Sequence, residues 1–150
     1  MTMEIGPDVQ TWAIAESTVL QTDRRIIFRY AKAFSPAFDR GSQPIRIIIV
    51  WKCQSELGQP ISEEHQRMNI LEDALEPVLD KDNFATLALV STGEDLREWT
   101  YYAKSENDLM ARINFALAGM PAFPIEIHIV HDPKWDTYEQ FRARVREVVN

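Results

Sequence analysis

Two histidines and an aspartate lie close together near the end of the chain, at His128, His131 and Asp132. Imidazole and carboxylate groups are ligands of zinc and similar ions, so this trio suggests a metal site. Side chains alternate between the two faces of a strand, and the odd separation of the histidines points their rings apart unless His131 lies beyond the strand. No cluster of Cys or Glu supplies the remaining ligands. We therefore expect neither a metal nor another cofactor.

Aromatic and imidazole side chains also occur at neighbouring strand ends, at Trp99, His128, His131 and Trp135. A pocket near these residues would suit a small molecule or an enzyme reaction. However, the chain has no glycine-rich phosphate loop and no serine elbow, and no motif activates Cys53 as a nucleophile. An enzyme or a small-molecule-binding protein is therefore the alternative hypothesis, and we predict no catalytic residue.

The charge of the chain limits its partners. Its formal net charge is −7, and residues 53–82 contain eight acidic and two basic side chains. An acidic balance repels phosphate backbones, so we expect no nucleic-acid partner. Glu72, Asp73 and Glu76 are predicted on the outer face of a helix, where they form a candidate binding surface for a basic partner.

The hydrophobic segments are short, and cysteine is scarce. The longest apolar runs, such as residues 47–51, fall far below the roughly 20 residues that a membrane helix needs, so we expect no membrane contact. Cys53 is the only cysteine and cannot form an internal disulfide, and residues 1–5 lack the pattern of a signal peptide. These features indicate a cytoplasmic protein.

The pattern of apolar residues predicts six strands. Alternation of apolar and polar side chains indicates a hairpin near the N-terminus, and a run of β-branched residues after the loop 35–44 indicates a central strand. A turn at residues 92–95 joins two later strands in a second hairpin. The predicted strands are 12–19, 25–34, 45–53, 84–90, 96–104 and 125–130.

Three helices are predicted between and after these strands. The first has Ser62 as its N-cap, and Pro77 should kink or end it because proline lacks the amide that the helix needs. The second follows a capping box at residues 105–108, and the third follows Pro133. The apolar face of the third helix consists of Tyr138, Phe141, Val145 and Val148.

Residues 45–130 thus run strand, helix, strand, strand, helix, strand, which is the order of the ferredoxin-like βαββαβ unit. Right-handed crossovers place strands 45–53 and 96–104 in the middle of its sheet. We predict an α+β sandwich with an added N-terminal β-hairpin and a C-terminal helix. The chain forms one domain, in which the hairpin and loop occupy 1–44 and the last turn and helix occupy 131–150.

The register of the strands divides their side chains between the two faces of the sheet. Odd-numbered positions are the more apolar in the last four strands, and we expect them to face the first two helices. The opposite face, which includes Phe84, is mixed in character. The inward positions are Ile45, Ile47, Ile49, Trp51, Ala85, Leu87, Leu89, Trp99, Tyr101, Ile125, Ile127 and Ile129.

The mixed face needs either a cover or a partner, because a large apolar patch is unusual on a monomer. The last helix could fold across it, or the N-terminal hairpin could extend the sheet and leave the face open. The sequence does not distinguish these arrangements. The candidate binding residues on this face are Arg46, Lys52, Tyr102, Lys104 and His128.

Three features of the later chain occur together: the isoleucine-rich strand that ends in Trp51, the helix over residues 64–75, and the segment from Asp132 to Tyr138. In this combination the chain resembles a bacterial family of unknown function, number 695, over roughly its last two-thirds. The resemblance implies an α+β sandwich that can accompany a domain similar to the protein inhibitor of ribonuclease E, and it transfers no catalytic residue. The most specific pattern is Asp-Pro-x-Trp-x-x-Tyr-x-x-Phe, at Asp132, Pro133, Trp135, Tyr138 and Phe141.

A structural role is sufficient for this pattern, since Pro133 fixes the turn into the helix and Trp135 anchors it. For the whole chain we predict a binding or regulatory domain that engages a protein partner or a second copy of itself. The contact would use the mixed sheet face or the acidic helix. An acidic immunity protein that neutralises a basic toxin is a further alternative.

Overall fold

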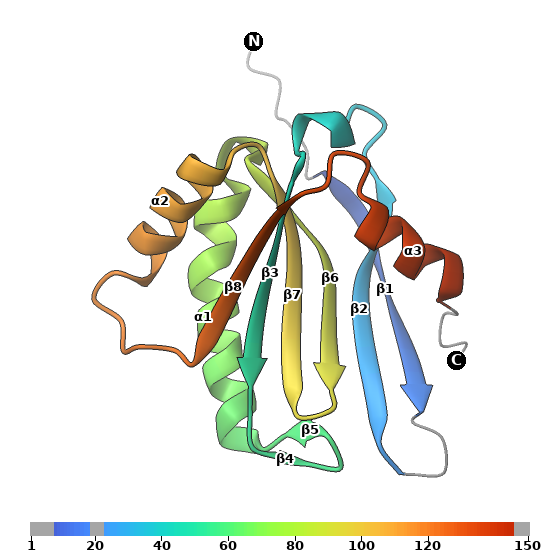
Figure 1. The fold of residues 1–150 in the computed structure, drawn as a ribbon, viewed down its shortest axis with the longest axis vertical. Coiled ribbons are helices and arrows are strands. Elements are labelled where there is room, and N and C mark those ends of the chain that lie inside the picture. The colour runs from blue at the N-terminus through green and yellow to red at the C-terminus, as the bar shows by residue number, and fades with distance from the viewer. Residues whose placement is uncertain (1–7, 19–22, 146–150) are drawn as a thin grey trace.

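Six strands form one antiparallel sheet in the computed structural model, which describes residues 8–18 and 23–145. The strand order is β1-β2-β6-β7-β3-β8 (Figure 1). A separate pair of short strands, β4 (Ser55–Glu56) and β5 (Gln59–Pro60), follows β3. The six strands are β1 (Val9–Thr18), β2 (Arg25–Phe34), β3 (Ile45–Lys52), β6 (Ala85–Gly93), β7 (Leu96–Ala103) and β8 (Ile125–His131).

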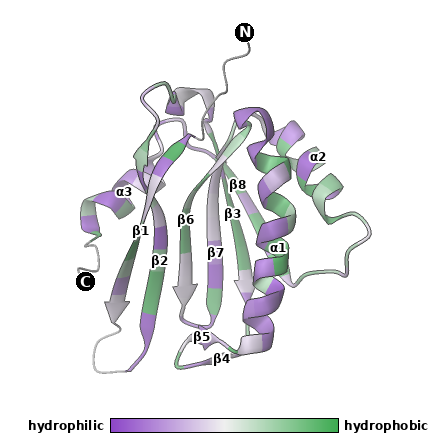
Figure 2. Ribbon diagram, turned by 180° about the vertical axis from the view of Figure 1, so that it is seen from behind, coloured by the Kyte–Doolittle hydropathy of each residue, from purple (hydrophilic) through white to green (hydrophobic). Residues whose placement is uncertain are grey.

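Helices lie on both faces of the sheet, which gives a mixed α+β fold. Helices α1 (Ser62–Asp80) and α2 (Glu106–Leu117) cover one face, whereas α3 (Asp136–Arg144) crosses the other (Figures 1 and 2). Short 3-10 turns, η1 (Arg40–Ser42) and η2 (Lys81–Asn83), precede β3 and β6. Within residues 8–18 and 23–145, no helix is both long and apolar enough to cross a membrane.

The ends of the first two helices show how local sequence sets their bounds. The side chain of Ser105 accepts the Asp108 amide at 3.3 Å, so α2 begins at the predicted cap. Ser62, however, is the first residue of α1 rather than its N-cap, because the extended residue before it is Ile61. Helix α1 also continues through Pro77, since one missing amide does not by itself end a helix that is held by core packing.

The main core lies between the sheet and helices α1 and α2. The odd-numbered side chains of β3 and β7 are buried there, among them Ile47, Trp51 and Trp99. They pack against one face of α1, and the odd-numbered isoleucines of β8 border the same core. The predicted register is therefore confirmed for these three strands. The buried residues that α1 contributes are Met68, Leu71, Leu75 and Leu79.

Strand β6 departs from the predicted register. Its ladder with β7 shifts between Leu87 and Leu89, which places one extra residue in β6 and forms a β-bulge. Because side chains alternate with a period of two, Leu89 turns towards α3 and Val90 towards α1. The prediction for Leu89 was thus wrong. Phe84 was also misplaced: it precedes β6 with helical backbone angles (φ −69°, ψ −43°) and packs in the main core.

The N-terminal hairpin extends the sheet beyond β6, which is one of the two arrangements that the sequence left open. Strand β2 pairs with β6 only over residues 27–30, opposite residues 89–92, so this ladder stops at the bulge. A side chain at Gly93 would place its Cβ 2.7 Å from the carbonyl oxygen of Arg25, and glycine therefore permits the close approach of the two strands. Helices α1 and α2 do not cover the hairpin (Figure 2).

Candidate functional site

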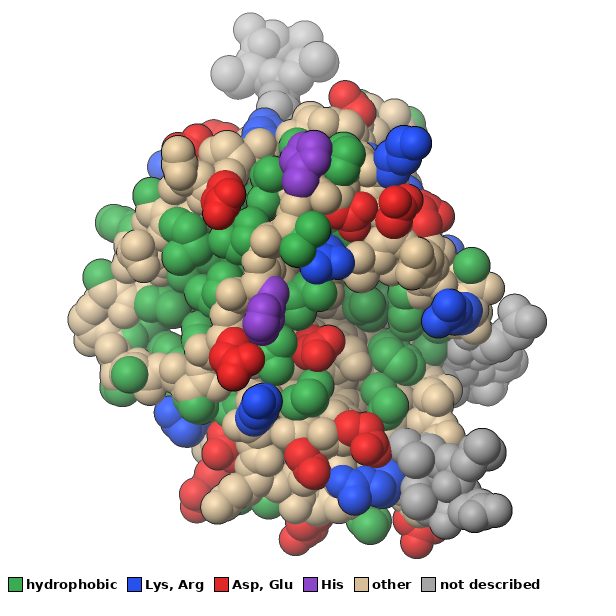
Figure 3. All heavy atoms as spheres, in the orientation of Figure 1, with side chains coloured by type: hydrophobic (Ala, Val, Ile, Leu, Met, Phe, Trp, Pro, Cys, Tyr) green, Lys and Arg blue, Asp and Glu red, His purple; other side chains and the backbone are tan. Residues whose placement is uncertain are grey.

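The sheet face that carries most of the predicted binding residues is partly covered by α3 and the turn before it. Tyr102 lies beneath Trp135, and both side chains are fully buried (0 %). Their rings stack nearly in parallel, with centroids 4.1 Å apart. Farther from α3, His128 stays exposed on β8, where histidine and charged side chains line the surface (Figure 3). The cover therefore hides Tyr102 and leaves His128 open.

Asp132 joins Tyr102 to the start of α3. The Tyr102 hydroxyl donates to Asp132 Oδ2 at 2.8 Å, and the amides of Asp136 and Thr137 donate to the same carboxylate at 2.9 and 3.2 Å. Burial acts to raise the pKa of Asp132, but these hydrogen bonds outweigh it and leave the pKa below its ordinary value. The carboxylate therefore serves as the anchor of the helix N-terminus.

Trp135 completes this connection from an unusual backbone conformation. It has left-handed angles (φ 58°, ψ 39°), which are costly for a residue with a bulky side chain. Its indole donates to the carbonyl oxygens of Arg40 at 3.2 Å and Gln43 at 3.0 Å, and the Tyr138 hydroxyl donates to Ala31. We call Tyr102, Asp132, Trp135 and Tyr138 the helix clip.

The other members of the sequence pattern support the same helix. Phe141 packs its ring against Phe28 and Tyr30, at centroid distances of 5.1 and 5.2 Å. Val145 packs in the same cluster just after α3, whereas Val148 lies outside the described residues. Pro133 is exposed in the turn. The described members of the pattern thus hold the last helix on the sheet.

The remaining candidates on the mixed face do not converge. Arg46 donates to Thr137 Oγ1 at 2.7 Å, whereas Lys104 is exposed. Lys52 and His128 are exposed on either side of Glu126, at 3.8 and 3.4 Å from its carboxylate. Lys52, Glu126 and His128 form a charged edge along β3 and β8, apart from Lys104, which follows β7.

The pocket predicted from aromatic and imidazole residues is not assembled either. Trp99 lies in the core beneath α1, on the opposite face of the sheet from Trp135, and His131 is exposed. Burial, then Glu64 and Asp95, raise the pKa of Cys53, which keeps its thiol protonated. Across the described part of the chain, no group of three or more His, Cys, Asp or Glu side chains could hold a metal ion.

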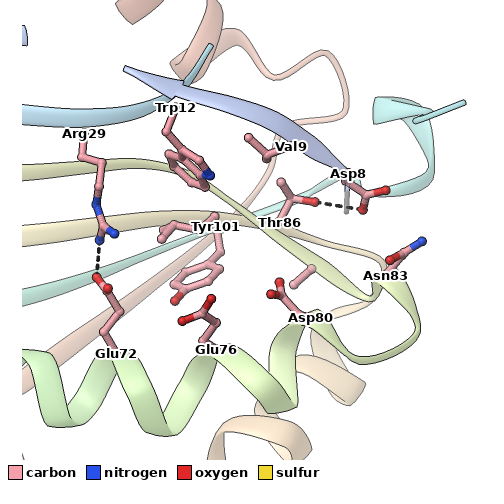
Figure 4. A pocket seen from close by; sticks show the side chains of 12 residues that line it. Asp8, Val9, Trp12, Arg29, Glu72, Glu76, Asp80, Asn83, Thr86 and Tyr101 are labelled. Carbon is pink, nitrogen blue, oxygen red and sulfur yellow. Dashed lines mark hydrogen bonds and ion pairs between the residues drawn. The ribbon is translucent and has the colours of Figure 1, made fainter. Parts of the chain in front are cut away.

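A cleft of about 300 Å³ opens instead between α1 and the N-terminal hairpin (Figure 4). Its walls come from α1, β1, β2 and β6, and four of its lining side chains are acidic. Only Arg29 supplies a positive charge among the lining residues of the described chain. We call this the acidic cleft. Its polar and aromatic lining residues are Asp8, Trp12, Arg29, Glu72, Glu76, Asp80, Asn83, Thr86 and Tyr101.

One end of the acidic cleft is closed by an internal ion pair. Arg29 pairs with Glu72, and the same Glu72 oxygen accepts the indole N–H of Trp99 at 2.8 Å. The guanidinium of Arg29 also lies 5.9 Å from the centre of the Trp12 ring. Glu72 is therefore committed to contacts within the chain.

Glu76 and Asp80 continue the same row of acids without a counter-charge. Residues spaced by four lie on one face of a helix, so Glu72, Glu76 and Asp80 project towards the hairpin together. The ion pairs of the described residues include neither Glu76 nor Asp80. Burial, reinforced by Glu76 and Asp8, raises the pKa of Asp80 to about 6. This end of the cleft therefore has an uncompensated negative field.

Tyr101 forms the floor of the acidic cleft between the two ends. Its side chain is only 2 % exposed, and its hydroxyl points towards Glu72 and Glu76 (Figure 4). Within the described chain, this buried hydroxyl has no hydrogen-bond partner. Tyr30 has an unpartnered hydroxyl too, but it does not line the cleft. A buried polar group without a partner costs free energy, and Tyr101 is the residue of this kind that lines the cleft within the described chain.

The structure brings together two of the three acids predicted on the helix surface. Glu72 and Glu76 line the cleft, while Asp73 points to solvent. Sequence reasoning missed Asp80 and Tyr101, as well as Asp8 and Trp12 from the hairpin. The four-residue spacing from Glu72 to Asp80 was the signal that could have identified the row.

These observations define a small α+β domain with a ligand-sized acidic cleft on one side of its sheet and a helix clip on the other. The model of a family of unknown function, DUF695, matches residues 10–142. Because this match covers most of the chain, the protein belongs to that family, and the resemblance extends through the N-terminal hairpin. No curated protein and no solved structure matches the chain significantly.

Proposed function

We propose that this chain is a protein-binding domain that docks a basic surface of its partner onto the acidic cleft. The observation that carries the proposal is the pair Glu76 and Asp80, which line the cleft and take part in none of the ion pairs of the described residues, because Arg29, the cationic lining residue among them, pairs with Glu72. A partner that supplies positive charge would remove the repulsion between these carboxylates. Complementary charge of this kind also speeds association and selects the partner.

Apolar surface beside the cleft supports a protein as the partner. Trp12 and Ile14 on β1 are 44 % and 57 % exposed, although both are large hydrophobic side chains. Aromatic anchors next to charged rims are typical of protein interfaces. Nucleic acid is a poor fit, because four acids around the cleft would repel its phosphates.

The finer features of the fold and location belong to the same proposal. We propose that β3, α1, β6, β7, α2 and β8 form a ferredoxin-like unit, which the order β6-β7-β3-β8 and the position of both helices on one face support. We also propose a cytoplasmic location, for which the single cysteine, Cys53, is the support.

Zero-length cross-linking tests the proposed surface. A carbodiimide joins carboxylates directly to lysine amines, so partners captured by the full chain from its native cells should be cross-linked through residues 72–80. The double variant Glu76→Lys with Asp80→Lys should lose these partners, whereas Glu126→Lys, a charge reversal on the opposite sheet face, should keep them. Circular dichroism would verify that each variant is folded.

Two results would contradict the proposal. One is unchanged capture by the double variant, and the other is cross-links that map to the open edge around Glu126. Self-association is the other form of contact that the sequence suggested, and it is measured by sedimentation of the purified chain. Dimers that survive the double charge reversal would place the contact elsewhere than the acidic cleft.

A further inference from the structure

We propose that the acidic cleft recognises one lysine side chain of the partner, with its ammonium group between Glu76, Asp80 and the Tyr101 hydroxyl. The methylene stem of that lysine would lie against Trp12 and the apolar lining of the cleft. This inference rests on the proposed function and specifies the chemical group that the cleft binds.

The size and lining of the cleft fit one extended side chain. A volume of about 300 Å³ lies at the lower end of ligand pockets, too small for a folded element of a partner. Its walls include Val9, Trp12, Ala85 and Leu87, which offer apolar contact over part of the cavity. Long basic side chains bury their stems against such surfaces and place the charge at a polar end.

The polar groups beside Glu76 and Asp80, at the end of the cleft away from the Arg29–Glu72 pair, match an ammonium ion. An ammonium group has three donors and no acceptor, and a phenol oxygen and two carboxylates are acceptors. Tyr101 reaches into the cleft from β7, whereas Glu76 and Asp80 approach from successive turns of α1 (Figure 4). An incoming ammonium would give the buried Tyr101 hydroxyl a donor and balance both carboxylates.

This arrangement favours lysine over arginine. A guanidinium is a planar fork that binds best to the two oxygens of one carboxylate, whereas an ammonium is a compact charge with rotatable donors. Here the proposed acceptors belong to three separate side chains that line the same cleft. The carboxylate suited to a fork, Glu72, already pairs with Arg29 inside the chain.

Binding should depend on pH through Asp80. Its pKa of about 6 reflects burial, together with Glu76 on its own helix and Asp8 from the hairpin. Arg29 and Thr86 face the cleft from β2 and β6, and only Arg29 of these two is charged. Because the ammonium needs an ionised Asp80, we expect affinity to fall on the order of tenfold between about pH 7.5 and about pH 5.

Titration of the full chain with small probes tests the inference. The first probe is lysine blocked at its backbone by acetyl and methylamide groups, and we expect saturable, millimolar binding followed by the indole N–H signal of Trp12. Acetylation of the side-chain amine should abolish the response. Glu76→Gln and Asp80→Asn should each weaken binding about tenfold, and Tyr101→Phe should weaken it less. Glu126→Gln is the matched control outside the cleft and should bind normally.

Comparison of blocked lysine with other cationic probes gives the results that would overturn the inference. Blocked arginine that binds as tightly as blocked lysine would remove the proposed selectivity. A free diamine or spermidine that binds far more tightly than a lysine-containing peptide would assign the cleft to small polyamines instead. Affinity that does not change between about pH 7.5 and about pH 5 would exclude a role for ionised Asp80.

The two proposals fail in different ways. If the charge-reversal variant loses its protein partners but blocked lysine does not bind the wild type, the lysine inference is wrong and the docking surface stands. If blocked lysine binds but the double charge-reversal variant still captures its protein partners, the proposed function is wrong. Peptides from the cross-linked partner, with and without their lysine, then verify the assignment directly.

Discussion

Tyr101 and Tyr102 are neighbours on β7, and their side chains point to opposite faces of the sheet. Both are buried, at 2 % and 0 % exposure, yet among residues 8–18 and 23–145 only the Tyr102 hydroxyl has a hydrogen-bond partner. The aspartates beside them differ in the same way. Hydrogen bonds lower the pKa of Asp132 against the effect of burial, whereas burial among other acids raises the pKa of Asp80 to about 6.

The contrast distinguishes polar side chains that stabilise the folded state, in the helix clip, from polar side chains that do not, in the acidic cleft. In the helix clip, each polar atom that leaves water meets a partner within the chain, so the residues contribute stability. In the acidic cleft, the Tyr101 hydroxyl is buried without a partner among the described residues, and Asp80 lies beside other acids without an ion pair, so both lower stability. The proposed function therefore rests on the polar groups of the cleft that have no partner among the described residues, and not on the helix clip.

The largest expected effect comes from replacing the aromatic anchor of the clip. Trp135→Ala should reduce the free energy of unfolding by about 3–5 kcal/mol, because it removes a fully buried indole and its stacking on Tyr102. Urea denaturation measures this change. Trp12→Ala is the matched control in the cleft and should cost less than about 1 kcal/mol, since its side chain is 44 % exposed. Equal losses for both variants would contradict the division between the two faces.

A smaller loss is expected from the carboxylate of the clip. Asp132→Ala should cost about 2–3 kcal/mol, because the hydroxyl of Tyr102 and two helix amides would lose their acceptor. Thermal unfolding at neutral pH measures it. In the wild type this stability is present above the ordinary aspartate pKa of 3.8 and is lost as pH falls through the lower folded value. A variant as stable as the wild type would show that the network is dispensable.

Tyr101→Phe should have the opposite sign from Tyr102→Phe. Removing the unpartnered hydroxyl of Tyr101 should leave stability unchanged or raise it by up to about 1 kcal/mol, whereas the Tyr102 variant should lose about 1–2 kcal/mol. Both changes remove one oxygen from a buried ring, so each variant controls for the other in the same denaturation experiment. A loss of stability in the Tyr101 variant would indicate a partner for its hydroxyl within the chain.

The smallest effect concerns Asp80. Its folded pKa of about 6 lies above the ordinary value of 3.8, so the folded state favours the neutral acid. Its contribution to stability is therefore present below about pH 4 and is lost as pH rises through about 6. Asp80→Asn should be a few tenths of a kcal/mol more stable than the wild type at neutral pH, with the difference vanishing near pH 4. A stability difference that is constant across this range would contradict the assignment.

Much of the fold could be predicted because the spacing of apolar residues along a strand or helix indicates which side chains are buried. The alternation in β3, β7 and β8 placed Ile47, Trp99 and Ile127 on the correct face, and the capping residues located the start of α2. Leu89 could not be placed in this way. One extra residue in a strand moves the following side chains to the opposite face of the sheet, and the apolar character of the strand gives no sign of it.

The acidic cleft was harder to predict than the clip. The pattern from Asp132 to Phe141 is contiguous in sequence, so its role in turning and anchoring a helix could be inferred locally. The cleft joins Asp8 and Trp12 to Asp80 and Tyr101 across more than half of the chain. Only the tertiary arrangement shows that these residues share a cavity and that the buried Tyr101 hydroxyl has no hydrogen-bond partner in the described part of the chain.

The bulge in β6 has a consequence for comparison within the family. The ladder between β2 and β6 ends at this extra residue, and the cleft lies where the hairpin and β6 no longer pair, along Ala85 and Leu87. A relative that lacks one residue between positions 87 and 89 would have a regular strand there, without the break at which the ladder with β2 ends. Strand length at this position should therefore divide the family into members with and without the cleft, even where every acid is retained.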